Sequence, residues 1–217
     1  MALTSIQLMH LADSALPVGG FAFSHGLESA VKCGMVAAKD DLERYFEGAL
    51  SQWIVFDGPF LKRFFADHSA ANLLRYDRMM LSPSMQKASF AQGRGWLRIF
   101  GELFPETDVQ ALRIQLKELG LGSHYLPLFT ASLKMAGATE GQIRELYLFT
   151  LLRDQTSAAI RLGLIGPSAA QAMQSRLERK LGEKLVEPLS VDPQRFTPLL
   201  DLAQMLPPSL YTKLFQN

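Results

Sequence analysis

Apolar residues recur every three or four positions along nearly the whole chain, which is the spacing of one face of an α-helix. Residues 40–56 show this most clearly, with a stripe that runs from Leu42 to Ile54. Convincing alternation of apolar and polar residues, the pattern of a half-buried strand, is absent. The sequence therefore predicts an all-α fold, a single-domain bundle of roughly eight to ten helices at ordinary helix lengths.

Local signals predict where some of these helices begin and how closely they pack. The segments Thr139–Gln142 and Ser168–Gln171 both have the pattern of a capping box, so we expect a helix to start at each. The helix predicted over residues 84–104 contains Gly93 and Gly95. Two glycines inside a helix either weaken it or let another segment approach its backbone.

The composition of the sequence changes after Pro188, where prolines interrupt short apolar segments. We expect an all-helical domain over residues 1–198 and a C-terminal tail with short helices over residues 199–217. Apolar side chains at helical spacing near the end of the tail are suited to binding a partner. These anchors are Tyr211, Leu214 and Phe215. The alternative is that the tail folds back on its own domain.

Charge and cysteine content narrow the class of protein. The 217 residues carry 22 Lys+Arg and 21 Asp+Glu, a net charge of +1, which does not favour nucleic acid or an acidic membrane as a partner. The single cysteine, Cys33, allows no internal disulfide. The N-terminus lacks the pattern of a secretory signal, and no apolar run approaches the ~20 residues of a membrane span. We therefore expect a cytoplasmic protein.

Motifs for catalysis and for cofactor or metal binding are missing or incomplete. Neither phosphate-binding glycine motif is present, and the four histidines have no metal-ligand spacing. Ser24 beside His25 completes only half of a nucleophile elbow, so a small hydrolase that uses Ser24 is a weak alternative. In the structural alternative, Ser24 caps the helix that follows it. We expect no enzyme activity, no catalytic residue, no cofactor and no metal site.

The stretch ADSALPVGGFAFSHGLE, residues 12–28, predicts a shaped turn between two helices. The ring of Pro17 fixes its backbone angle φ, and Gly19 and Gly20 permit backbone conformations that other residues avoid. Loops of this kind often face a partner, although this one could also pack inside its own domain. Glu28 is the best polar candidate for a partner contact; the alternative is a solvated carboxylate in the first turn of a helix.

Four ordered blocks of the sequence resemble urease accessory proteins of the F type, the UreF family. They are LADSALPVGGFAFSHGLE, HYLPLF, QTSAAIRLGLIGPSAAQ and PLLDLAQM…LYTKLF. Together they cover nearly the full chain. This chain departs from the family pattern near the C-terminus, where it has Pro207 and Pro208, and at Asp154, where the family often has Asn.

The resemblance implies a non-enzymatic scaffold. Proteins of this family are all-α, form homodimers, and bridge the D-type (also called H-type) urease accessory protein and the G-type GTPase. The assembly inserts nickel into apo-urease, and the F-type subunit is thought to modulate the GTPase. The alternative within the same process is a metallochaperone that binds nickel itself.

Taken together, the loop, two helices and the tail supply the predicted partner-binding residues. Arg161 is among them because it could reach a phosphate or carboxylate of a partner, or could instead pair with Asp154. The full set is Asp13, Ser14, Pro17, Gly19, Gly20, Phe21, Ser24, His25, Glu28, Arg161, Gln171, Tyr211, Leu214 and Phe215.

Overall fold

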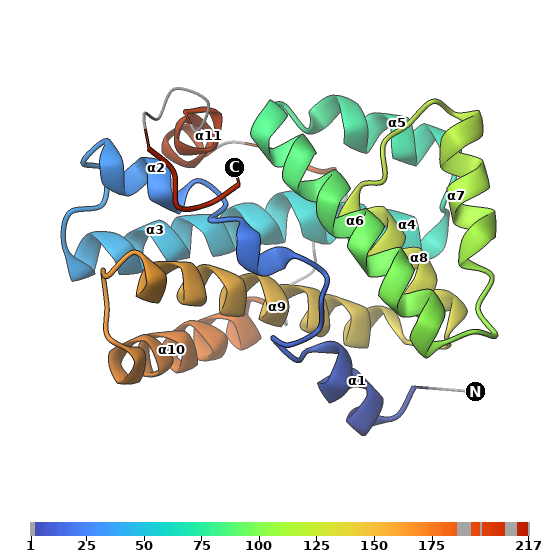
Figure 1. The fold of residues 1–217 in the computed structure, drawn as a ribbon, viewed down its shortest axis with the longest axis horizontal. Helices are drawn as coiled ribbons and strands as arrows, with labels where there is room; N and C mark the ends of the chain where they lie inside the picture. Colours follow the sequence, from blue (N-terminus) through green and yellow to red (C-terminus); the bar gives the residue numbers. More distant parts are fainter. Residues whose placement is uncertain (1–2, 186–191, 196, 207–211, 217) are drawn as a thin grey trace. The chain divides into compact units, whose positions relative to one another are not determined.

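The computed structural model describes residues 3–185, 192–195, 197–206 and 212–216. Within these ranges the secondary structure is helical and contains no strand, so the predicted all-α class is confirmed (Figure 1). The chain forms two compact units: Met1–Gly20 with Phe60–Tyr147, and Phe21–Pro59 with Leu148–Asn217. The predicted division between residues 198 and 199 stays a prediction.

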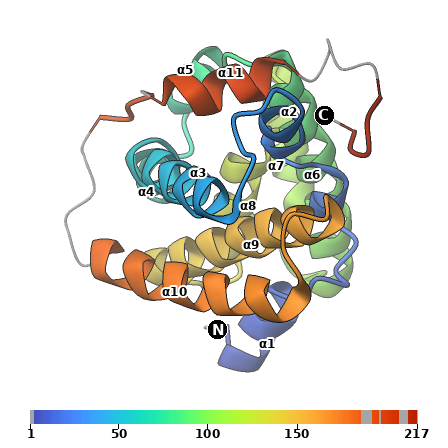
Figure 2. The same cartoon turned by 90° about the vertical axis from the view of Figure 1, so that its left-hand side faces the viewer.

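The first unit is built around two packed helices. Its elements are α1 (Ser5–Leu11), most of α4 (Gly58–Ala66), α5 (Ala70–Met79), α6 (Pro83–Leu103), α7 (Val109–Glu118), α8 (Tyr125–Met135) and the start of α9 (Glu140–Arg161). Helices α6 and α8 lie side by side in both views (Figures 1 and 2). Trp96 of α6 contacts the Phe129 ring at a centroid distance of 4.6 Å and donates its indole N–H to Ser132 at 2.8 Å. The core of this unit therefore combines aromatic burial with a satisfied polar group.

The two glycines of α6 permit close packing. A Cβ atom on Gly93 would lie 1.9 Å from the carbonyl oxygen of Ser123, and one on Gly95 would lie 2.6 Å from that of Val18. Helix α6 nevertheless runs unbroken through both positions. Of the two expectations for these glycines, close backbone approach is the one the structure confirms.

The second unit holds α2 (Leu27–Lys32), α3 (Lys39–Gln52), the π-helical turn η2 (Trp53–Asp57), the end of α9, α10 (Pro167–Leu185) and α11 (Pro198–Met205). Helix α11 lies beside α2 in both views (Figures 1 and 2). Gly26, which precedes α2, makes this possible because a Cβ there would lie 3.1 Å from the backbone nitrogen of Gln204. The helix at the start of the tail therefore packs against α2, which belongs to the same unit.

One of the two predicted capping boxes forms. Thr139 Oγ1 accepts the N–H of Gln142 at 3.3 Å, and Gln142 Oε1 accepts the N–H of Thr139 at 2.9 Å. The box predicted at Ser168 is wrong, since α10 already begins at Pro167 and Ser168 lies inside its first turn. Proline suits the first position of a helix because its missing N–H would have had no partner there.

Candidate functional site

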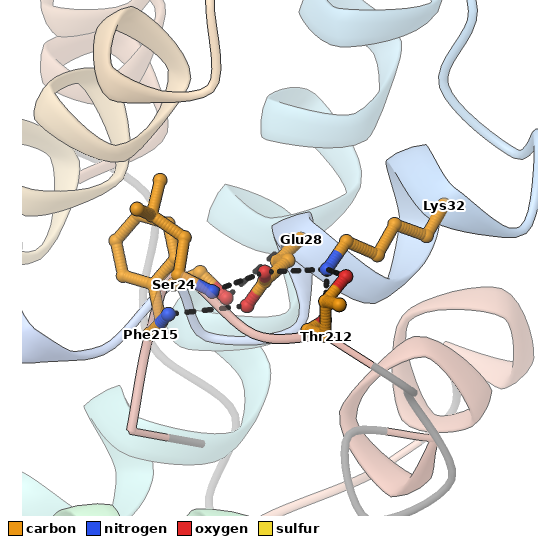
Figure 3. A network of polar contacts seen from close by, with 6 residues as sticks. Ser24, Glu28, Lys32, Thr212 and Phe215 are labelled. Carbon is orange, nitrogen blue, oxygen red and sulfur yellow. Dashed lines mark hydrogen bonds and ion pairs between the residues drawn. The ribbon is translucent and has the colours of Figure 1, made fainter.

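A buried carboxylate holds the end of the chain within the second unit. Glu28 is only 1% exposed. Its Oε1 accepts the backbone N–H of Leu214 at 2.7 Å, and its Oε2 accepts that of Phe215 at 3.3 Å (Figure 3). Lys32, one helical turn away, contacts the same carboxylate at 2.9 Å. The alternative in which Glu28 is a solvated carboxylate is therefore wrong, because the tail covers it.

The local fold that places Glu28 begins with an unusual turn. Gly26 has φ +93° and is the N-cap of α2, and His25 before it has φ +52°. Both lie in the left-handed region, which is common for glycine and uncommon for histidine. Ser24 Oγ accepts the N–H of Glu28 at 3.3 Å (Figure 3). The serine therefore bonds to the first turn of α2, as expected of a capping side chain, although it is not the N-cap residue.

The tail segment 212–216 is held at both of its ends. Lys32 Nζ donates to the carbonyl oxygen of Thr212 (Figure 3). Near the other end, the N–H of Gln216 donates to the carbonyl oxygen of Ala22 at 2.9 Å. We call Ala22, Glu28 and Lys32 the tail-binding site. Phe215 is 4% exposed, so the alternative that the tail folds back on its own chain is what the structure adopts for this residue.

Arg161, at the end of α9, connects the loop to the tail. Its guanidinium carbon lies 3.5 Å from the ring centroid of Phe21 and 4.2 Å from that of Phe215. The alternative in which Arg161 pairs with Asp154 is wrong, because Asp154 Oδ1 instead accepts hydrogen bonds from Arg153 at 2.7 and 3.0 Å. Burial lowers the pKa of Arg161, and the charge of Asp154 opposes this shift.

His25 is a buried, neutral side chain in this region. Burial lowers the pKa of its imidazole, while Asp154 acts in the opposite direction. Its Nε2 is buried with no hydrogen-bond partner in the described structure. Its carbonyl oxygen accepts the hydroxyl of Tyr45 at 3.3 Å, and burial raises the pKa of that phenol. Ser24 beside it is fully buried, so its hydroxyl is not exposed to a substrate as a hydrolase would require.

The first half of the loop belongs to the other unit and forms a tight turn there. Asp13 Oδ1 accepts the N–H of Ala15 at 2.8 Å. The carbonyl oxygen of Pro17 accepts from Arg98 at 3.5 Å, and Gly19 has φ +92°. Ser14 is exposed, and Gly20 opens the short 3₁₀-helix η1 (Gly20–Ala22). These contacts account for the turn-forming residues through the shape of the turn itself.

The remaining predicted residues divide by exposure. Phe21 and Leu214 are 62% and 61% exposed, so both offer apolar surface beside the tail-binding site. Gln171 is exposed on α10. Tyr211, Pro207 and Pro208 lie outside the described residues.

The sequence did not predict a polar network in the first unit. The buried ring of His124 bonds to Asp77 Oδ1 through Nε2 at 3.0 Å and to Ser89 Oγ through Nδ1 at 3.1 Å. Ser89 Oγ also accepts the N–H of Tyr125, the first residue of α8, at 3.0 Å. Burial lowers the pKa of His124 more than Asp77 raises it. The network therefore contains a neutral histidine that supports the start of α8.

Two further site classes find no support in the part of the chain that the structure describes. No group of three His, Cys, Asp or Glu side chains there lies in an arrangement that could hold a metal ion. None of the described helices combines the length and apolar character that crossing a membrane requires.

Comparison with known proteins gives the chain a family. The model of the family described as UreF matches residues 36–178. The urease accessory protein F of Oryza sativa subsp. indica is 32% identical over 94% of this chain and 82% of its own length.

The chain belongs to the UreF family.

Other relatives extend the similarity across kingdoms. The urease accessory protein F of Arabidopsis thaliana is 31% identical over 94% of this chain and 89% of that protein. The urease accessory protein UreF of Azoarcus sp. strain BH72 is 28% identical over 98% of this chain and 95% of that protein. The match to the UreF model contains Arg161 but neither Glu28 nor the tail, whereas these relatives align over nearly the whole chain.

Proposed function

We propose that this UreF-family chain is a urease accessory protein, a non-enzymatic scaffold that acts in the maturation of urease. The observation that carries the proposal is its similarity, over 94% of its length, to proteins named urease accessory protein F. The finer part of the proposal is that it bridges the D/H-type accessory protein and the G-type GTPase, and so promotes nickel insertion into apo-urease. It acts as a cytoplasmic homodimer and modulates the GTPase without hydrolysing GTP itself.

Exposed apolar side chains in the second unit support a role in protein binding. On α11, Leu199 is 72% exposed, Leu202 46% and Met205 45%. Their spacing of three residues places them along one side of the helix. Large apolar side chains gathered on a surface are typical of interaction sites. A neighbouring groove of about 520 Å³ is lined by Tyr45 and Leu199, among others.

The tail-binding site supports a link between the loop and the tail. Glu28 and Phe21 come from the loop, and Leu214 and Phe215 come from the tail, so both predicted partner-binding segments meet in one place. We propose that partner proteins bind the surface formed by the loop and the tail together, rather than either segment alone. The exposed side chains of Phe21 and Leu214 are its apolar contacts.

Capture of the purified D/H-type and G-type accessory proteins tests the proposal. We expect the full chain to retain both proteins on an affinity column, and a chain that ends at residue 198 to retain less of at least one. Equal capture by the two forms would remove the tail from the proposal. No capture by either form would contradict the scaffold function itself.

A further inference from the structure

Arg161 presents an unused pair of hydrogen-bond donors. Its Nε and Nη2 atoms are both buried, and neither has a hydrogen-bond partner in the described part of the chain. These two N–H groups point along the same edge of a guanidinium and form the fork that receives both oxygens of a carboxylate. Buried polar groups are normally satisfied, and a buried donor without a partner is destabilising. The fork therefore lacks hydrogen-bond acceptors, which the oxygen atoms of an oxyanion would supply.

Nearby charges do not fill this role. Asp154, the carboxylate whose charge acts on Arg161, already accepts two hydrogen bonds from Arg153. Glu28 is occupied by two tail N–H groups and by Lys32. Among the described residues, neither of these two carboxylates is therefore available to the fork.

The aromatic rings beside Arg161 favour a flat ligand. Phe21 and Phe215 both lie at stacking distance from the guanidinium carbon, at 3.5 and 4.2 Å. A carboxylate bound to the fork is coplanar with the guanidinium and adds no bulk above or below that plane, unlike a tetrahedral phosphate. Phe21 is 62% exposed, so it forms the side of the site that faces solvent.

We propose that Arg161, Phe21 and Phe215 form a carboxylate-binding site that is complete only when the tail is docked. Phe215 reaches Arg161 from a segment whose backbone is held by Glu28. Docking of the tail and binding of the carboxylate are consequently linked, and each strengthens the other. The source of the carboxylate is an Asp or Glu side chain of an accessory protein; this last step alone rests on the proposed function.

Titration of the isotope-labelled full chain with sodium acetate tests the site without any partner. The Nε–H resonance of Arg161, assigned by its loss in Arg161→Lys, is followed by NMR, with sodium chloride at equal ionic strength as the control salt. We expect a saturable shift with acetate and none with chloride. No shift, or the same shift with chloride, overturns the site, and equal affinity for sodium phosphate overturns its preference for a flat ligand.

Variants test the link to the tail. Glu28→Gln and Phe215→Leu leave Arg161 in place, and we expect each to weaken acetate binding by about tenfold. Phe215→Leu removes a cation–π contact with Arg161, and Glu28→Gln loosens the tail segment that carries Phe215. Arg179→Gln removes an arginine from the exposed surface of α10 and should change nothing. Unchanged acetate affinity in both tail variants would overturn the linkage.

Capture of the accessory proteins then separates this inference from the proposed function. We expect Arg161→Gln to lower capture of one accessory protein about tenfold, on the same reasoning, while Arg179→Gln captures both normally. If acetate binds but the wild-type chain captures neither protein, the proposed function fails and the site stands. If capture is normal in Arg161→Gln and acetate does not bind, the site fails and the proposed function stands.

Discussion

Replacing Glu28 by Gln should release the tail without unfolding the second unit. The carboxylate accepts two backbone N–H groups, at 2.7 and 3.3 Å, and hydrogen bonds to a charged acceptor each contribute about 1.5–3 kcal/mol. A glutamine keeps one acceptor oxygen but turns an NH₂ group toward the other N–H. We therefore expect docking of the tail to weaken by about 2 kcal/mol, or roughly 30-fold.

Hydrogen exchange of the Leu214 and Phe215 amides measures this change directly, because their protection reports how often the tail leaves Glu28. Glu43→Gln is the matched control: it removes a carboxylate of the same unit that pairs with Arg176 at 2.9 Å. We expect tail protection to fall about 30-fold in Glu28→Gln and to stay unchanged in the control. Unaltered protection in Glu28→Gln would refute the idea that this carboxylate holds the tail.

The remaining predictions concern two glycines and one buried histidine. Gly93→Ala should destabilise the chain by about 3 kcal/mol or more in urea unfolding, because its Cβ would meet a backbone oxygen at 1.9 Å; Gly48→Ala, with open space around its Cβ, should instead stabilise it by about 0.5–1 kcal/mol. Burial lowers the pKa of His124 below its ordinary 6.5. The unfolded chain therefore binds this proton more readily, and stability should fall as the pH drops below about 6.5. His124→Gln should make the unfolding free energy less dependent on pH between 7.5 and 5.5, while an unchanged pH slope would show that this histidine is not responsible.

Helical periodicity was sufficient to predict the fold class, because an amphipathic helix requires only that its apolar residues share one face. The starts of the helices were harder to predict. The segments at Thr139 and Ser168 have equivalent patterns, yet only the first forms a capping box. Pro167 explains the difference, since it starts the helix one residue before the serine can cap it.

The chemistry of the site depended on contacts between distant segments. A first-turn glutamate is normally solvated, and Glu28 is buried only because a segment 186 residues further along the chain covers it. Pairing with Asp154 is one of the two alternatives that the sequence leaves open for Arg161, but Arg153 lies next to that aspartate and takes its place. The His124 network joins residues 35 and 47 positions apart, so no local pattern could have predicted it.

The most direct test of the proposed function is nickel insertion itself. Urease subunits and the D/H-type and G-type accessory proteins would be produced in cells that lack an F-type protein, with and without this chain, and the nickel content and activity of the purified urease measured. The proposed scaffold predicts that nickel content and activity both rise when the chain is present, and that Arg179→Gln supports the same rise. Urease that remains equally low in nickel with and without the chain would contradict a role in urease maturation.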